Sequence, residues 1–134
     1  MKNNMEMTVS FEGKAKVIAE FNGIRIVTDQ PVPAGDGSAP TPFHLFLASL
    51  ATCAGIFVRS FCDQRGIPTD RISITQKMVF DQSTHLISDM EIIINLPSDF
   101  PEKYKDAVVK AADLCLVKRH LQNPPKIKTI AVIS

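Results

Sequence analysis

The sequence predicts an α+β fold in a single domain spanning residues 1–134. Short runs of alternating apolar and polar residues at the N-terminus are typical of antiparallel strands. A long apolar stretch in the middle of the chain follows a helix-start signal, and strand-like and helix-like segments follow it. Hydrophobic residues make up 45% of the chain and charged residues 22%, which is enough apolar material for a packed core.

The first 28 residues are expected to form antiparallel strands. Apolar and polar residues alternate from Met7 to Phe11 and again from Ala15 to Phe21. The pair Asn22-Gly23 is typical of a two-residue hairpin turn and leads into a third run, Ile24 to Val27. The next stretch, TDQPVPAGDGSAPTP, is rich in proline and glycine and predicts a long surface loop.

A long central helix is expected after this loop. Thr41 and Pro42 form a start signal, because a hydroxyl can cap the helix and proline is tolerated at its first position. The helix should end near Arg65, before Gly66. Its segment from Phe43 to Val58 is apolar on nearly every face and shorter than the ~20 residues of a membrane span. We therefore expect a buried helix and no membrane, with part of its surface covered by a second copy of the chain.

The second half of the chain predicts a β-hairpin followed by helices. Ile72 to Phe80 and Met90 to Leu96 read as two antiparallel strands joined around residues 81–85. Asp99 and Glu102 have the spacing of a capping box for the next helix.

That helix has apolar residues at helical spacing and ends near Cys115, and Leu116 to Leu121 form a further short turn. Asn123-Pro124-Pro125 should stop it, and the β-branched run Ile127 to Ile133 predicts a final strand.

Charge and motif content exclude several classes of function. Fifteen Lys and Arg residues against fourteen Asp and Glu residues leave a net charge of +1, so we expect no nucleic-acid partner. The three histidines lie far apart, and no Cys-x-x-Cys spacing occurs, so we expect no metal. The glycine loop lacks the pattern of a phosphate-binding loop and is read as a flexible connection. No cofactor is expected. The polar N-terminus and odd cysteine count predict a cytoplasmic protein.

The three cysteines are not equivalent. Cys53 and Cys62 are nine residues apart on the expected helix, a rotation of about 900°, so they point to opposite faces and cannot bond to each other. Cys115 is therefore the available partner for Cys53, if Cys53 has one. A buried cysteine is more often a small core residue than a nucleophile, and burial raises a thiol pKa.

A reactive Cys53 would need a positive charge to hold its thiolate, and this charge must come from elsewhere in the fold. Arg25 is the only arginine that precedes Cys53, while Lys118 and Arg119 lie just beyond Cys115. Each of these cations, taken singly, is more often a solvated surface charge.

Two segments resemble the signatures of the OsmC/Ohr family, the osmotically inducible protein C and organic hydroperoxide resistance proteins. The first segment is SAPTPFHLFLASLATCAGIFV followed by RSFCDQRGIP, and the second is DLCLVKRHLQNPPKIKTIAVI. Cys53 and Cys115 match the two cysteine positions of the family. The helix start, Pro42-Phe43-His44-Leu45, lacks the glutamate of hydroperoxide-reducing members, and Leu116 replaces their proline. The chain thus resembles a divergent OsmC-like branch.

The resemblance implies the OsmC-like fold, an intertwined homodimer and a thiol peroxidase. Cys53 would attack an organic hydroperoxide and become a sulfenic acid, and Cys115 would convert it to a disulfide. A dithiol reductant would restore both thiols. Arg25 is the candidate activating cation. An apolar pocket for the substrate is expected around a set of residues near the central helix: Phe43, Phe46, Leu50 and Phe57.

Two alternatives remain. A non-catalytic binding or stress-associated protein would keep the fold and an apolar pocket at the dimer interface, with Cys53 as a packed core residue. A redox sensor would use the same disulfide to change its affinity for a partner. Cys62 is expected to have no catalytic part in any of the three.

Overall fold

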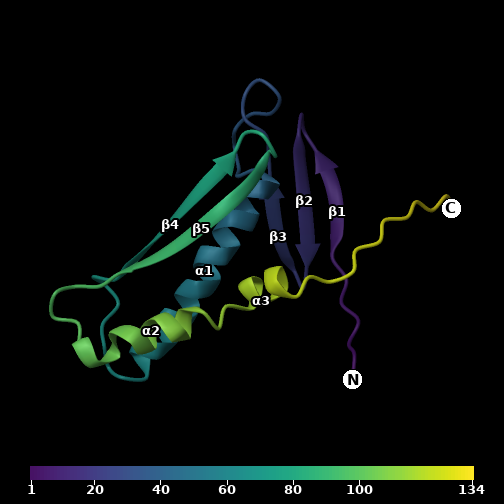
Figure 1. The fold of residues 1–134 in the computed structure, drawn as a ribbon. Coiled ribbons are helices and arrows are strands. Elements are labelled where there is room, and N and C mark those ends of the chain that lie inside the picture. The colour runs from purple at the N-terminus through teal and green to yellow at the C-terminus, as the bar shows by residue number, and fades with distance from the viewer. The chain divides into compact units, whose positions relative to one another are not determined.

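The computed structural model describes residues 1–134 and divides the chain into two compact units, Met1–Ala48 and Ser49–Ser134. Figure 1 traces the elements in chain order. They are β1 (Thr8–Glu12), β2 (Lys16–Phe21), β3 (Ile24–Thr28), α1 (Pro42–Asp63), β4 (Ser73–Asp81), β5 (Leu86–Asn95), a 3-10 turn (Glu102–Tyr104), α2 (Lys105–Ala112) and α3 (Leu116–Gln122). The mixture of strands and helices confirms the predicted α+β class, and the organisation as a single domain stays a prediction.

The first unit contains a three-stranded antiparallel sheet in the order β1-β2-β3. The turn between β2 and β3 confirms the expected hairpin, because Asn22 and Gly23 both have positive φ angles, 47° and 76°. Ile18 on β2 is the fully buried residue of this sheet. Every residue of β1 is exposed.

The proline-rich loop after β3 is organised around a buried carboxylate. Asp29 accepts hydrogen bonds from the Ser38 hydroxyl at 2.7 Å, the Ser38 N–H at 3.1 Å and the Gln30 N–H at 2.8 Å. Gly35 approaches so closely that an added Cβ would clash with an Asp29 carboxylate oxygen and with the Gln30 carbonyl oxygen. The loop is thus held in one conformation, which its composition did not predict.

Helix α1 begins at Pro42 as predicted, and the Thr41 hydroxyl accepts a hydrogen bond from the His44 N–H at 3.2 Å. The helix ends at Asp63, and Gly66 follows with a φ of 65°, a conformation that favours glycine.

The length of α1 corrects one expectation. An 18-residue window of its 22 residues has a mean hydropathy of 1.8, so by length and composition alone the helix could cross a membrane. The flanking turns lengthen the helix beyond the apolar segment from Phe43 to Val58. The central helix of a soluble protein meets the same criteria, and α1 buries Ala54, Val58 and Phe61 against its own unit.

The second unit contains the predicted β-hairpin. Strands β4 and β5 pair antiparallel from Ser73 opposite Asn95 to Asp81 opposite Leu86, with an irregularity between Val79 and Phe80. The second strand starts at Leu86, earlier than the expected Met90. The two strands are joined by a turn that starts at Asp81, whose side chain accepts a hydrogen bond from the Ser83 N–H at 2.8 Å.

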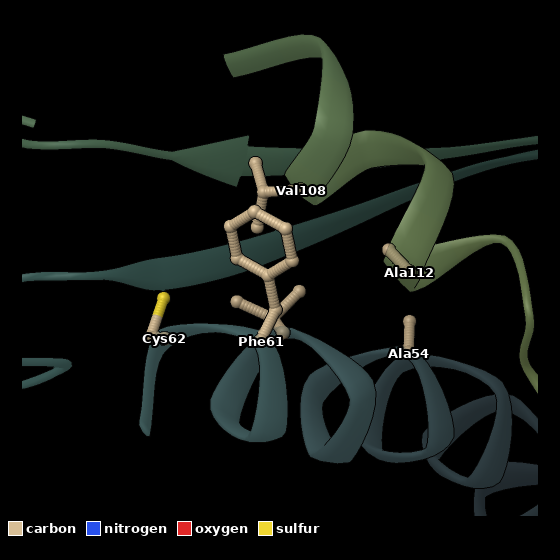
Figure 2. Packing of buried hydrophobic residues seen from close by; sticks show 6 residues of the cluster. Ala54, Phe61, Cys62, Val108 and Ala112 are labelled. Atoms are coloured by element: carbon tan, nitrogen blue, oxygen red, sulfur yellow. The ribbon is translucent and has the colours of Figure 1, made fainter. Parts of the chain in front are cut away.

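The core of this unit lies between α1 and α2. Figure 2 shows Ala54 and Phe61 on α1 facing Val108 and Ala112 on α2, with Cys62 at the end of the same cluster. Apolar side chains of the hairpin, including those of its strand β5, pack against this cluster. The predicted helical spacing identifies this face only in part: Val108 is buried and Ala107 and Ala111 pack against the cluster, whereas Leu114 lies beyond α2 and is exposed.

The predicted capping box is wrong. Asp99 does not cap a helix, because both of its carboxylate oxygens accept hydrogen bonds from Arg71, at 2.7 and 2.9 Å. The chain first forms a 3-10 turn at Glu102, and α2 begins at Lys105 without a side-chain cap. A distant cation competes successfully for the carboxylate, and local spacing cannot reveal this competition.

The predicted final strand is also absent from the single chain. The segment from Ile127 to Ile133 has no regular structure, and its large apolar side chains are exposed. A strand exists only through hydrogen bonds to a neighbouring strand, and no strand of the chain pairs with this segment. The short helix expected from Leu116 is present as α3, and it ends before Asn123 as predicted.

Candidate functional site

The structure brings together the two cysteines that the sequence paired. Cys53 lies on α1 and is half-buried, and Cys115 is buried immediately before α3. A hydrogen bond joins their side chains. The Cys115 thiol also lies 3.8 Å from the Leu50 carbonyl oxygen, one helical turn before Cys53. All three cysteines are free thiols.

Cys115 is the N-cap residue of α3. Its sulfur accepts a hydrogen bond from the Lys118 N–H at 3.4 Å, the position of a capping side chain. The N–H groups of Leu116 and Val117, which have no partner within the helix, point to the Cys53 sulfur instead. The first turn of α3 therefore places donors on both sulfurs.

These contacts separate the pKa values of the two thiols. Burial is the largest influence on Cys53 and opposes its ionisation, but hydrogen bonds from Val117, the Cys115 thiol and Leu116 outweigh it, and the pKa of Cys53 falls below its ordinary value. Burial raises the pKa of Cys115, and the neighbouring Cys53 raises it further, against a hydrogen bond from Lys118. Cys53 is thus the thiol that ionises first, and Cys115 stays protonated beside it.

Cys62 has a different environment. It is fully buried in the core between α1 and α2, as Figure 2 shows, and neither of the other two cysteines forms a hydrogen bond with its thiol or influences its pKa. Burial raises the pKa of its thiol, and the charge of Asp63 adds to the increase. These properties describe a packed, unreactive core residue. No three His, Cys, Asp or Glu residues come together in a group that could hold a metal ion.

Two of the three candidate cations, Arg25 and Lys118, already have partners. Arg25 on β3 forms ion pairs with Glu12 and, at 3.7 Å, with Glu20. The Lys118 ammonium group donates to Asp113 at 2.8 Å. The donors to Cys53 are the Cys115 thiol and two backbone N–H groups, and sequence reasoning missed these backbone donors. A cysteine placed just before a short predicted helix was the signal that could have identified them.

An apolar cleft of about 740 Å³ opens next to Cys115. Its walls come from α1, from one face of β5, and from α2 and α3. The lining residues are Leu50, Ala54, Ser88, Met90, Ile92, Ile94, Leu96, Lys105, Val109, Ala112, Asp113, Cys115, Lys118, Leu121 and Gln122.

The expected lining of this pocket is largely wrong. Of the four predicted residues only Leu50 lines the cleft, and Phe43 and Phe46 stack on each other in the first turns of α1. The cleft is walled by the hairpin instead, because β5 presents Met90, Ile92 and Ile94 on alternate positions of one face. The docking of a hairpin on a helix is a long-range contact that periodicity does not reveal.

The comparisons with known proteins agree with this architecture. The sequence model of the family described as OsmC-like protein matches residues 35–130. No curated protein is matched by the sequence. The chain is similar to a solved structure from Psychrobacter arcticus, a putative osmotic stress induced and detoxification response protein, with a TM-score of 0.71, 21% identity and 89% of each chain covered.

Two further structures extend the likeness. An OsmC-like protein from Mycoplasma pneumoniae has a TM-score of 0.69 and 14% identity, and the match covers 92% of this chain and 91% of the other. An organic hydroperoxide resistance protein from Bacillus subtilis has a TM-score of 0.54 and 20% identity, with 90% and 93% covered. At these identities the likeness establishes the fold.

Proposed function

Because the chain belongs to the OsmC-like protein family, we propose that it reduces organic hydroperoxides with a pair of cysteines, Cys53 and Cys115. The observation that carries the proposal is the placement of two free thiols side by side, Cys53 on α1 and Cys115 at the start of α3, and the lowered pKa of Cys53 supports it. The similarity to an organic hydroperoxide resistance protein of Bacillus subtilis supports the same reaction class.

The reaction begins at Cys53. Its thiolate attacks the distal oxygen of the hydroperoxide, the O–O bond breaks, and the alkoxide takes a proton and leaves as the alcohol. Cys53 becomes a sulfenic acid, so the sulfur is oxidised by two electrons and the peroxide is reduced by two. A lowered thiol pKa provides more of the attacking thiolate at neutral pH.

The second step uses Cys115. Its sulfur attacks the sulfenic acid, a disulfide forms, and the hydroxyl group leaves as water with the Cys115 proton. An external dithiol then reduces the disulfide by thiol–disulfide exchange and returns both thiols. Cys115, the N-cap of α3, lies beside Cys53 on α1 and is a free thiol, so it is the residue available to resolve the sulfenic acid.

The apolar cleft is proposed to hold the organic part of the substrate. Met90, Ile92 and Ile94 provide an apolar wall, and Cys115 lines the same cleft. An alkyl group in this cleft would favour organic hydroperoxides over hydrogen peroxide. We also propose that the protein acts in the cytoplasm, where dithiol reductants are available.

The first experiment maps cysteine oxidation. The reduced protein receives one equivalent of cumene hydroperoxide, and mass spectrometry follows the three thiols over time. We expect a Cys53–Cys115 disulfide to form while Cys62 stays reduced. The Cys53→Ser variant should lose peroxide consumption, and Cys62→Ser, its matched control on the same helix, should retain it.

The alternative function is a non-catalytic binding protein. The cleft of about 740 Å³ favours it, because a cavity of this size can hold a small apolar ligand without any chemistry. If all three thiols remain free after cumene hydroperoxide is added, the peroxidase proposal is contradicted. Binding of small apolar ligands to the cleft would then be the measurement that tests the alternative.

A further inference from the structure

We propose that Cys115 acts before it resolves the sulfenic acid, as a positioning residue whose thiol donates a hydrogen bond that holds the Cys53 thiolate. This inference rests on the proposed function for its place in the reaction, but the activation of Cys53 that it describes requires no peroxide. It assigns to Cys115 the part that sequence reasoning gave to a cation.

The placement of the Cys115 sulfur is the first observation. The side chain is 1% exposed, so solvent does not compete for its single proton. Its sulfur accepts the Lys118 N–H at 3.4 Å, and this bond fixes its position at the start of α3. An accepted hydrogen bond polarises the group and strengthens the bond that the same group donates.

The choice of acceptor for the Cys115 proton is the second observation. With Cys53 neutral, the Leu50 carbonyl oxygen is within reach at 3.8 Å, a long and weak contact. Cys53 lies one turn further along the same face of α1, within hydrogen-bonding reach of Cys115. Once Cys53 loses its proton, its sulfur becomes the stronger acceptor, because a bond to a charged group is about twice as strong as a neutral one.

The charges nearby do not supply an alternative. On α3, the Lys118 ammonium group is paired with Asp113 at 2.8 Å, and Arg119 is exposed. On α1, the charged residues nearest in sequence to Cys53 are Arg59 and Asp63, which form an ion pair with each other. The hydrogen-bond donors therefore dominate the surroundings of the Cys53 sulfur.

The test measures Cys53 ionisation directly. The rate of alkylation of Cys53 by iodoacetamide is followed from pH 5 to 10 by peptide mass spectrometry in the wild type, Cys115→Ser and Cys115→Ala. Serine keeps a hydroxyl that can donate and can cap α3, whereas alanine can do neither. We expect Cys115→Ala to slow alkylation at pH 7 by about tenfold and to move the pH profile upward. Cys115→Ser should recover most of this loss.

Controls separate the hydrogen bond from general damage. Cys62→Ala removes a buried thiol from the same core without touching Cys53, so it should leave the profile unchanged. Amide hydrogen exchange of α3 reports whether the helix persists in each variant. Arg25→Ala tests the cation that the sequence suggested, and we expect it to leave the profile unchanged.

Two results would overturn the inference. One is an unchanged alkylation profile in Cys115→Ala, with α3 still protected from exchange. The other is a loss in Arg25→Ala that exceeds the loss in Cys115→Ala. A shifted profile without any reduction of cumene hydroperoxide would support the inference while contradicting the proposed function. If the wild type reduces cumene hydroperoxide but Cys115→Ala alkylates with an unshifted pH profile, the proposed function would be supported and the inference contradicted.

Discussion

At the scale of single residues, the structure places polar side chains where the backbone supplies several donors. Asp29 is 1% exposed, and its carboxylate is held by donors from Ser38 and Gln30. Cys53 likewise meets N–H groups from the first turn of α3. In both cases the anion is stabilised by hydrogen bonds from backbone N–H groups together with one side-chain donor, rather than by a neighbouring cation.

The Asp29 contacts predict a pH-dependent stability. The Ser38 hydroxyl, the Ser38 N–H and the Gln30 N–H lower the pKa of Asp29 to about 2, against the effect of burial. A lowered folded-state pKa means that the stabilisation is complete above the unfolded value near 4 and is lost as the pH falls toward about 2. Asp29→Asn should therefore be less stable than the wild type at pH 7, and the difference should shrink between pH 4 and pH 2. Urea unfolding at a series of pH values measures it.

An Asp36→Asn variant is the matched control for this prediction. Asp36 is exposed in the same loop. Its replacement should leave the free energy of unfolding nearly unchanged across the same pH range. A pH-independent difference between wild type and Asp29→Asn would contradict the proposed role of the charge.

At the scale of elements, α2 contributes through one face. Val108 is fully buried against α1, and its neighbour Val109 is 48% exposed and faces the cleft. The Phe61 ring packs edge-on against the Tyr104 ring, with 5.7 Å between the ring centroids. The central carbon of the Arg65 guanidinium lies 3.7 Å from the centroid of the Phe61 ring. These contacts close the end of the core between α1 and α2.

The difference between the two valines predicts a difference in stability. Val108→Ala removes two buried methyl groups and leaves a cavity, so it should lower the free energy of unfolding by about 2 kcal/mol. Val109→Ala makes the same chemical change at the exposed face and should cost less than about 1 kcal/mol. Equilibrium urea denaturation of the two variants compares them. Equal losses would mean that α2 does not pack as described.

Local signals predict these elements well and their long-range contacts poorly. The Asn22-Gly23 turn and the Thr41-Pro42 start are encoded within a few residues, and both are correct. The capping box failed because Arg71, distant in sequence, binds Asp99. The donors to Cys53 and the hairpin wall of the cleft could not be predicted from the sequence for the same reason, because both depend on how separate elements pack.

At the scale of the whole molecule, exposed apolar surface indicates a partner. Within the second unit, Ile56 on α1 is 56% exposed, and the apolar side chains of the segment after α3 are also exposed. The sequence predicts that a second copy covers part of α1, because a chain of 134 residues cannot enclose such a helix. We therefore expect the homodimer that the family resemblance implies, and we expect the final segment to form a strand only within it.

Sedimentation velocity tests this assembly. The wild type should sediment with about twice the mass of the 14.8 kDa chain. Ile56→Asp places a charge on the exposed face of α1 and should shift the protein toward the monomer. Met5→Asp, a change of similar character in the exposed N-terminal segment, should not. A wild type that sediments as a monomer at all concentrations would contradict the expectation.

The position of Cys115 as the cap of α3 has a thermodynamic consequence. Helix α3 has seven residues and no buried side chain, so by itself it would be marginal in water. Its N–H groups stabilise the Cys53 anion, and by reciprocity the anion must stabilise α3 by the same free energy. Ionisation of one sulfur and local ordering of one helix are thus a single coupled equilibrium. Conditions that fray α3 will return Cys53 to an ordinary thiol well before the core between α1 and α2 unfolds.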